Sequence, residues 1–178
     1  MKKEKLNFTP FPELKTERLI LRQLTEDDTQ EIFFLRTDES VNLYIERPRP
    51  ENINDAIDFI LKTNNGIKQN EMIDWAIMLK DAQKLIGTIC LWNFSEDKTR
   101  AEVGFELKPD YQGKGIMNEA LNKILEYGFE TCHLTAIDGY THKDNIGSIK
   151  LLKKNNFEQN TELKDNENSN NIIFTRTN

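Results

Sequence analysis

A glycine-interrupted turn at residues 112–117 joins a strand-like run at 102–107 to a helical run at 118–130. A turn of this kind leaves the first N–H groups of the helix without intrahelical acceptors, at the positive end of the helix dipole. Gly113 and Gly115 have no Cβ, so the backbone there can approach a ligand closely and adopt positive φ. Such a turn binds phosphate well, and we expect a phosphorylated ligand here.

The runs around this turn predict a mixed α+β fold. Strand-like runs at 74–79, 85–92 and 100–107 are joined by short polar turns, which is typical of an antiparallel meander. The helix after the glycine turn leads to a further strand-like run at 134–140, which makes one strand–helix–strand crossover. We therefore expect a largely antiparallel, mixed sheet that is flanked by helices.

Cap residues and helical spacing predict three more helices. Thr25 would cap a helix that ends near Arg36, Asn52 a helix over 53–64, and Asn145 a helix over 146–155. The residues expected to face inward on the second of these are Ile53, Ile57, Ile60 and Leu61. Further short strands are expected at 19–24, 157–163 and 172–175.

Length and composition indicate one globular domain. The chain has 178 residues, of which 37% are hydrophobic and 30% charged. We expect a loosely held lead-in at 1–13 and a single domain over 14–178. The net charge of −6 argues against nucleic acid as a partner. No apolar run is long enough for a membrane span and the N-terminus lacks a signal peptide, so we expect a cytoplasmic protein.

Metal and disulfide chemistry are not indicated by the cysteines and histidines. Cys90 and Cys132 form no disulfide framework. His133 and His142 have no ligand spacing that links them with the cysteines, so we expect no metal.

Two common phosphate-binding motifs fit the glycine turn poorly. A Walker A loop needs Gly-Lys followed by Ser or Thr, whereas here Lys114 lies between two glycines. A dinucleotide fingerprint needs a third glycine, where this chain has Asn118, and an acidic residue about 20 positions later, which Asp138 could supply. Five residues also separate the strand from Gly113. The dinucleotide interpretation is therefore the weaker alternative.

Several motifs together resemble the GNAT acetyltransferases, in particular the ribosomal-protein N-acetyltransferase (Rim-type) branch. Gln-Gly-Lys-Gly-Ile-Met at 112–117 resembles the loop by which these enzymes hold the pyrophosphate of acetyl-CoA. Further matching stretches lie in family order at 14–22, 85–87, 101–107, 117–121 and 145–157, so the resemblance covers nearly the whole chain. Asn156 replaces the usual glycine before Phe157, which is tolerable because Asn accepts the left-handed conformation at a helix end.

The resemblance implies that acetyl-CoA is the cosubstrate and that its pantetheine arm pairs with strand 103–107 as an added strand. Gly104 would mark a bulge that separates this strand from 134–140. The residues expected to bind acetyl-CoA are Phe105, Glu106, Leu107, Gln112, Gly113, Lys114, Gly115, Ile116, Met117 and Asn145.

The implied chemistry is direct attack of a neutral amine on the thioester. Glu102 is the first choice of general base, with Glu106 and Asp74 as alternatives. Many family members use a Tyr as the acid for the leaving thiolate, but the equivalent residue here is Leu152. Ser148 is the expected substitute, and it could equally be a hydroxyl without a proton role.

The acceptor is an amine, either the N-terminus of a (ribosomal) protein or a small molecule, because the fold does not fix the acceptor. Its binding wall is expected from the irregular segment 38–50 with Tyr44 and Arg47, and from Tyr140. A protein that binds acyl-CoA without catalysis is the rival class, and a homodimer is left open.

Overall fold

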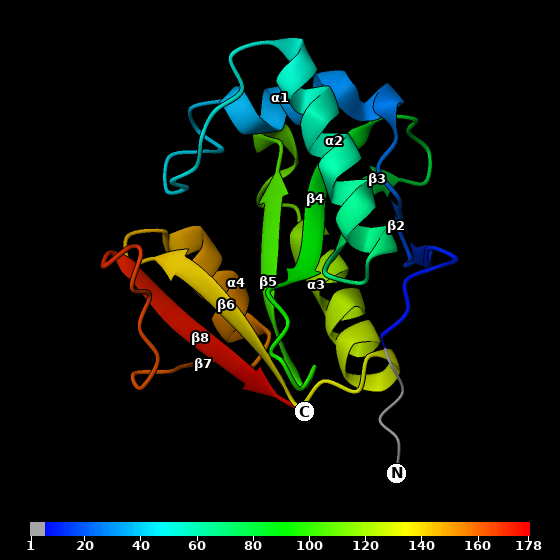
Figure 1. Cartoon of the computed structure of the whole chain (residues 1–178). Coiled ribbons are helices and arrows are strands. Elements are labelled where there is room, and N and C mark those ends of the chain that lie inside the picture. Colours follow the sequence, from blue (N-terminus) through cyan, green and yellow to red (C-terminus); the bar gives the residue numbers. More distant parts are fainter. Residues whose placement is uncertain (1–5) are drawn as a thin grey trace.

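The protein, seen here in a computed structural model that describes residues 6–178, is built on one eight-stranded sheet (Figure 1). The strand order is β1-β2-β3-β4-β5-β6-β8-β7, and every neighbouring pair is antiparallel except β5 with β6, which is parallel. The expected mixed, largely antiparallel sheet with one crossover is confirmed.

The helices and strands follow the chain in the order expected from the sequence. The strands are β1 (Leu14–Lys15), β2 (Leu19–Arg22), β3 (Ile73–Leu79), β4 (Leu85–Trp92), β5 (Arg100–Leu107), β6 (Ala136–His142), β7 (Glu158–Gln159) and β8 (Asn171–Thr177). The helices are α1 (Thr29–Thr37), α2 (Ile53–Lys68), α3 (Ile116–Glu126) and α4 (Ile146–Lys154). Short turns of other helix types, η1 (Glu26–Asp28), η2 (Pro109–Tyr111) and η3 (Tyr127–Thr131), precede or extend them.

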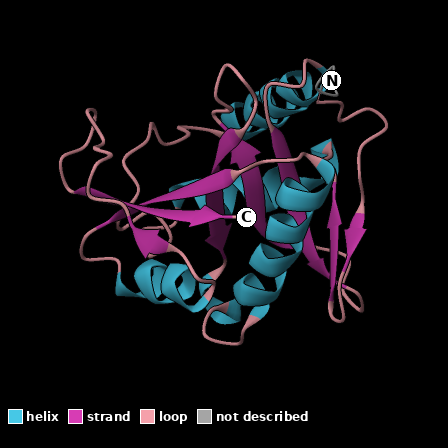
Figure 2. Ribbon diagram, turned by 90° about the horizontal axis from the view of Figure 1, so that it is seen from below, coloured by secondary structure: helices cyan, strands magenta, loops and turns pink. Residues whose placement is uncertain are grey.

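Helices cover both faces of the sheet (Figures 1 and 2). On one face, α3 and α4 pack on the larger apolar cluster, in which Leu121, Ile124 and Leu152 are fully buried. On the other face, α1 and α2 pack on a smaller cluster that includes Leu35 and Ile60. The sheet is thus buried on both sides, and any site has to form where it opens.

The predicted caps are present, and one inward position is wrong. Thr25 and Asp28 form the expected capping box, and the Asn52 side chain accepts from the N–H of Asn54. Leu61, however, is 50% exposed. The buried stripe of α2 follows Ala56, Ile60, Thr63 and Ile67, a spacing that places Leu61 about 100° away from Ile60 around the helix.

Hydrogen bonds from the backbone to the Asn160 side chain shorten the hairpin of β7 and β8. The strand expected over 157–163 reduces to Glu158–Gln159 because the Asn160 carboxamide accepts from the N–H groups of Glu162 and Leu163 and so bends the chain. Asn156 adopts φ 60°, as expected for a residue that ends a helix in place of glycine.

The described part of the lead-in, residues 6–13, is held against the core. Phe8 is 1% exposed and belongs to the larger cluster, and the indole N–H of Trp75 donates to the carbonyl of Pro12 at 2.9 Å. The expectation of a loose segment is therefore wrong for these residues, because their apolar side chains complete the core.

Candidate functional site

The sheet opens between β5 and β6. The two strands pair only from Arg100 to Glu102, opposite Ala136 to Asp138. At this end Arg100 Nη2 lies 2.7 Å from both carboxylate oxygens of Asp138, which fixes the strands together. Beyond it they diverge toward their carboxyl ends (Figure 1). Residues 103–107 of β5 therefore have a described strand partner only on the β4 side.

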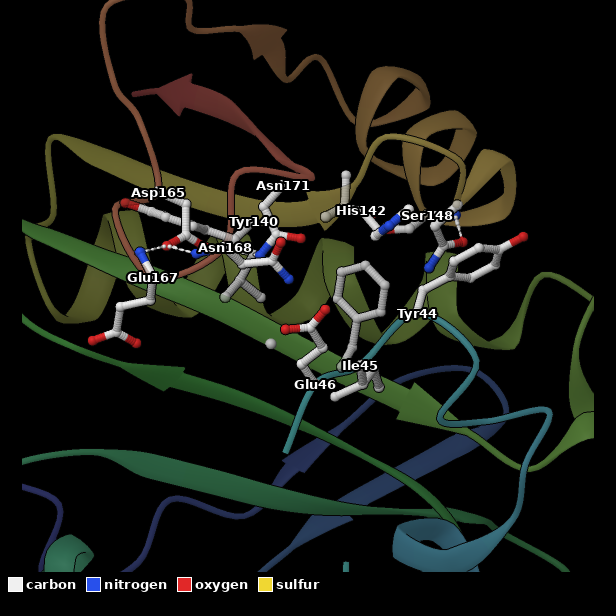
Figure 3. Close-up of a pocket in the computed structure, with 15 residues that line it drawn as sticks. Tyr44, Ile45, Glu46, Tyr140, His142, Ser148, Asp165, Glu167, Asn168 and Asn171 are labelled. Atoms are coloured by element: carbon white, nitrogen blue, oxygen red, sulfur yellow. Dashed lines mark hydrogen bonds between the residues drawn. The ribbon is translucent and has the colours of Figure 1, made fainter. Parts of the chain in front are cut away.

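A cavity of about 440 Å³ occupies the opening (Figure 3). Its walls come from the loop after α1, from β5 and β6, from the start of α4 and from the loop before β8. The lining residues are Tyr44, Ile45, Glu46, Val103, Gly104, Phe105, Tyr140, Thr141, His142, Asn145, Ser148, Asp165, Glu167, Asn168 and Asn171. Because successive strand residues alternate between faces, the cavity is lined from both faces of the sheet.

Gly104 permits a close approach of strands without a bulge. The β4–β5 register is continuous through the pair Cys90 and Gly104, so the expected bulge at Gly104 is wrong. A Cβ at Gly104 would lie 3.0 Å from Cys90 Sγ, so a larger residue there would require the Cys90 side chain to shift.

The glycine turn has the geometry of an anion site. Gly113 and Gly115 adopt φ 72° and 75°, which favours glycine. Gly115 is the N-cap of α3, and the first hydrogen bond of that helix runs from Glu119 N–H to the Gly115 carbonyl at 3.1 Å. The N–H groups of the three preceding residues therefore have no intrahelical acceptor. The side chains of Ile116 and Met117 are buried, so these two residues present only their backbone.

Residues near the N-terminus hold this turn in place. The Glu119 carboxylate accepts from Arg18 Nε at 2.7 Å and from the Arg18 N–H at 2.8 Å, while Arg18 Nη1 donates to the carbonyl of Lys114 at 3.1 Å. The hydroxyl of Thr16 also donates to Glu119. Inspection of the sequence missed this contact. The only signal was that residues 14–22 and 117–121 both belong to stretches with the family resemblance.

On the other side of the turn, the Gln112 side chain donates to the carbonyl of Leu107 at 2.9 Å and joins the turn to the end of β5. The Lys114 ammonium lies 5.8 Å from the centroid of the Tyr111 ring. The contacts of Arg18, Gln112 and Glu119 together hold the glycine turn at the open end of the gap between β5 and β6.

Asn145 and Ser148 lie together at the start of α4. Asn145 Oδ1 accepts from the Ser148 N–H at 3.1 Å, so its carbonyl oxygen caps the helix and its amide nitrogen is directed elsewhere. Tyr44 reaches the cavity from the loop after α1, and its ring lies 5.3 Å from that of His142. The cavity thus brings together Tyr44, Tyr140, Asn145 and Ser148, to which the sequence analysis gave separate roles in acceptor binding, cofactor binding and catalysis.

Glu102 is the last residue of β5 that pairs with β6, at the base of the opening. It lies on the same side of β5 as Gly104, which lines the cavity, but it does not line the cavity itself. Burial raises the pKa of its carboxyl group, and a hydrogen bond of 2.6 Å from Asn93 Nδ2 opposes that effect. Burial also raises the pKa of the Tyr140 phenol, and the nearby charge of Glu102 adds to it. A carboxyl group with a raised pKa next to a cavity is suited to accept a proton.

Arg47 and Glu106 form an ion pair away from the cavity. Arg47 Nη2 lies 2.6 Å from Glu106 Oε2, and Arg47 Nε donates to Asn42 at 2.9 Å. Both side chains are largely buried. Arg47 is not among the described residues that line the cavity, whereas Tyr44 is. The Glu106 carboxylate already has a cationic partner in Arg47.

Asp74 is a buried carboxyl group on β3. It is 4% exposed, and its Oδ1 has no hydrogen-bond partner within residues 6–178. Burial raises its pKa to about 7, with a further contribution from the negative charge of Glu106. The alternative base Asp74 is thus chemically suitable, but it does not line the described cavity.

Comparison with known proteins decides the family. The model of the acetyltransferase (GNAT) domain matches residues 18–158. The chain belongs to the GNAT acetyltransferase family. The uncharacterized N-acetyltransferase YoaA of Bacillus subtilis (strain 168) is 34% identical over 149 residues, which is 84% of each chain. This GNAT protein is therefore an N-acetyltransferase by family.

Solved structures agree in fold. Ribosomal-protein-S5-alanine acetyltransferase from Vibrio fischeri superposes with a TM-score of 0.78 at 23% identity, over 94% of this chain and 97% of that one. RimL, a ribosomal L7/L12 α-N-protein acetyltransferase solved in complex with coenzyme A, gives 0.80 at 14% identity, over 93% and 98%. The dinucleotide alternative is wrong, since this GNAT sheet is largely antiparallel and the Asp138 carboxylate is bound to Arg100.

The described residues of this GNAT protein contain neither a helix suited to span a membrane nor a group of metal ligands. Over 6–178, no helix combines the length and apolar character that a membrane span needs. In the same part of the chain, no three His, Cys, Asp or Glu side chains are grouped as metal ligands would be.

The raised pKa of Asp74 predicts a pH-dependent stability. Between about pH 4 and 7 the folded protein keeps a proton on Asp74 that the unfolded chain releases, so its contribution to stability falls as pH rises. Asp74→Asn should therefore gain stability relative to wild type over this range, by up to about 1.4 kcal/mol per pH unit. Urea unfolding at several pH values measures this difference. A difference that does not change with pH would show that Asp74 ionises normally.

Proposed function

We propose that this GNAT protein transfers an acetyl group from acetyl-CoA to the N-terminal amine of a protein, by direct attack of the amine on the thioester. The observation that carries the proposal is the arrangement of the opening. Within residues 6–178, the edge of β5 at 103–107 has no strand partner on the β6 side, and it ends at a turn whose N–H groups lack intrahelical acceptors. A cavity beside that edge is lined from both faces of the sheet.

The cofactor side of the proposal uses backbone groups for most contacts. The pantetheine arm would pair with Phe105, Glu106 and Leu107 as an added strand, which the parting from β6 permits. The diphosphate would lie against the N–H groups of the turn at 113–117, with Lys114 as a nearby cation. Asn145 would contribute its amide nitrogen, because its oxygen caps α4.

The acceptor side is the opposite mouth of the cavity. Tyr44 and Tyr140 would contact the chain that carries the amine, and Glu102 would take the proton from its ammonium group, directly or through a water. A β5 N–H would stabilise the oxyanion of the thioester carbonyl. The names of structural neighbours, which act on ribosomal proteins, support a protein N-terminus as acceptor.

A thiol-release assay tests this function. Acetyl-CoA is added with a panel of N-terminal peptides, including those of ribosomal proteins, and of small amines, and free thiol is followed. Release that depends on peptides is expected. Release with small amines alone would assign a small-molecule acceptor. Binding of acetyl-CoA without release across the panel would favour a non-catalytic acyl-CoA-binding protein.

The phosphate role of the turn is tested by a charge placed at Gly115. Gly115→Asp should weaken acetyl-CoA binding in calorimetry by at least about tenfold, because it adds a negative charge next to the N–H groups proposed to hold the diphosphate. Gly115→Asn is the matched control, since it has nearly the same shape and tolerates positive φ equally well. Equal affinities of the two variants would contradict a diphosphate at this position.

The role of Glu102 is tested by its pH profile. Glu102→Gln should lower kcat/KM by about 10²-fold or more. It should also remove the fall in rate at low pH, because that fall arises when the Glu102 carboxylate, which must be ionised to act as a base, becomes protonated. Asn93→Asp removes the hydrogen bond that lowers the Glu102 pKa and adds a negative charge, so the same fall in rate should move to higher pH. A normal rate of Glu102→Gln from about pH 6 to 9 would exclude it as base.

A further inference from the structure

Thr141 has a buried hydroxyl group that the proposed function leaves unused. The residue lies on β6, lines the cavity and is only 5% exposed. Its Oγ1 has no hydrogen-bond partner anywhere in the described chain. Buried polar groups of native proteins are nearly always paired, and leaving one unpaired is costly. A partner that arrives with a ligand would satisfy it.

The face of the sheet on which Thr141 lies indicates which ligand could pair with its hydroxyl group. Along β6 the side chains alternate, so Thr141 shares a face with Gly139 and not with Tyr140 and His142. A Cβ at Gly139 would lie 2.8 Å from Leu152 of α4, which places this face under α4. His142 points the other way, toward Tyr44. Thr141 is therefore on the cofactor side of the opening.

The polar neighbours on that side leave Thr141 free. Ser148 and Asn145 line the same cavity, yet Asn145 Oδ1 accepts from the Ser148 N–H rather than from Thr141. Phe105, across the opening on β5, offers only an apolar ring. An acceptor atom of the bound cosubstrate would then pair the Thr141 O–H.

With the diphosphate at the glycine turn and the pantetheine arm along β5, the thioester end of acetyl-CoA would lie deepest in the opening. That end has two acceptor atoms, the carbonyl oxygen and the sulfur. If the carbonyl oxygen accepts from a backbone N–H on the β5 edge, the sulfur would face the β6 side.

We propose that the Thr141 hydroxyl donates a hydrogen bond to the thioester sulfur of acetyl-CoA and stabilises the charge that gathers on it as the C–S bond breaks. This inference rests on the proposed function. The ammonium group first gives one proton to Glu102, directly or through a water, and the electron pair of the neutral amine then forms the C–N bond. The C–S electron pair leaves on sulfur, and the second proton of the attacking nitrogen is released to water. A Thr hydroxyl is a far weaker acid than a thiol, so Thr141 keeps its proton and coenzyme A departs as a thiolate.

The first test measures the thiol of bound coenzyme A, without any acetyl transfer. Coenzyme A is added to the full-length protein and its thiolate absorbance is titrated against pH. The thiol pKa should be lower on wild type than in free coenzyme A. It should be about one pH unit higher on Thr141→Val, which has the same shape without the hydroxyl, than on wild type. Thr141→Ser should restore most of the difference.

The second test is kinetic. Because the hydrogen bond strengthens as charge develops on sulfur, Thr141→Val should lower kcat by about 10- to 100-fold with little change in KM for acetyl-CoA. Thr141→Ser should recover kcat to within a few fold. Ser148→Ala in the same assays shows whether the neighbouring hydroxyl shares the role. Melting temperatures verify folding, and Thr141→Ala replaces the Val variant if that one unfolds.

The outcomes separate the two proposals. Equal thiol pKa values in wild type and Thr141→Val, or a wild-type value no lower than that of free coenzyme A, would overturn the Thr141 contact even if acetyl transfer proceeds. A thiol pKa that depends on Thr141 in a protein that acetylates no amine would support the contact and contradict the proposed function. Calorimetry that detects no binding of coenzyme A would overturn both.

Discussion

The parting of β5 from β6 is the constraint on which the site depends. The two strands are held together at one end, where Arg100 contacts both carboxylate oxygens of Asp138 and Thr175 also donates to that carboxylate. Beyond Glu102 the strands separate. There the ring of Tyr44 packs on His142 on one face of β6, and Leu152 packs against Gly139 on the other. One free strand edge and one cavity result from this single separation.

The two faces of the sheet provide different chemistry at the opening. The face under α3 and α4 presents hydrogen-bond donors, namely the N–H groups of the glycine turn and the hydroxyl of Thr141. The face under α1 and α2 carries the carboxyl groups of Asp74, Glu102 and Glu106. Hydrogen-bond donors can bind the phosphate and thioester oxygen atoms of acetyl-CoA. A carboxylate can accept the proton that an ammonium group has to lose.

Local patterns predicted much of this arrangement. The meander, the crossover and the caps at Thr25 and Asn52 follow from spacings of a few residues, and these were correct. The ion pair between Arg18 and Glu119 could not be predicted from local patterns, because the two residues are about 100 positions apart in the sequence. Thr141 looked like any strand residue, since a hydroxyl is significant only when it is buried without a partner.

The sequence by itself determined that a strand leads through two glycines into a helix, because only glycine adopts the positive φ of residues 113 and 115 without strain. It also determined the order of the strands along the chain. Only the tertiary structure decided which carboxylate is free to act. Glu106 and Glu102 lie on the same face of β5, yet Glu106 is paired with Arg47, whereas Glu102 has no cationic partner in the described ion pairs and lies where the pairing of β5 with β6 ends. Burial and ion pairs are set by segments distant in sequence, and a local pattern does not record them.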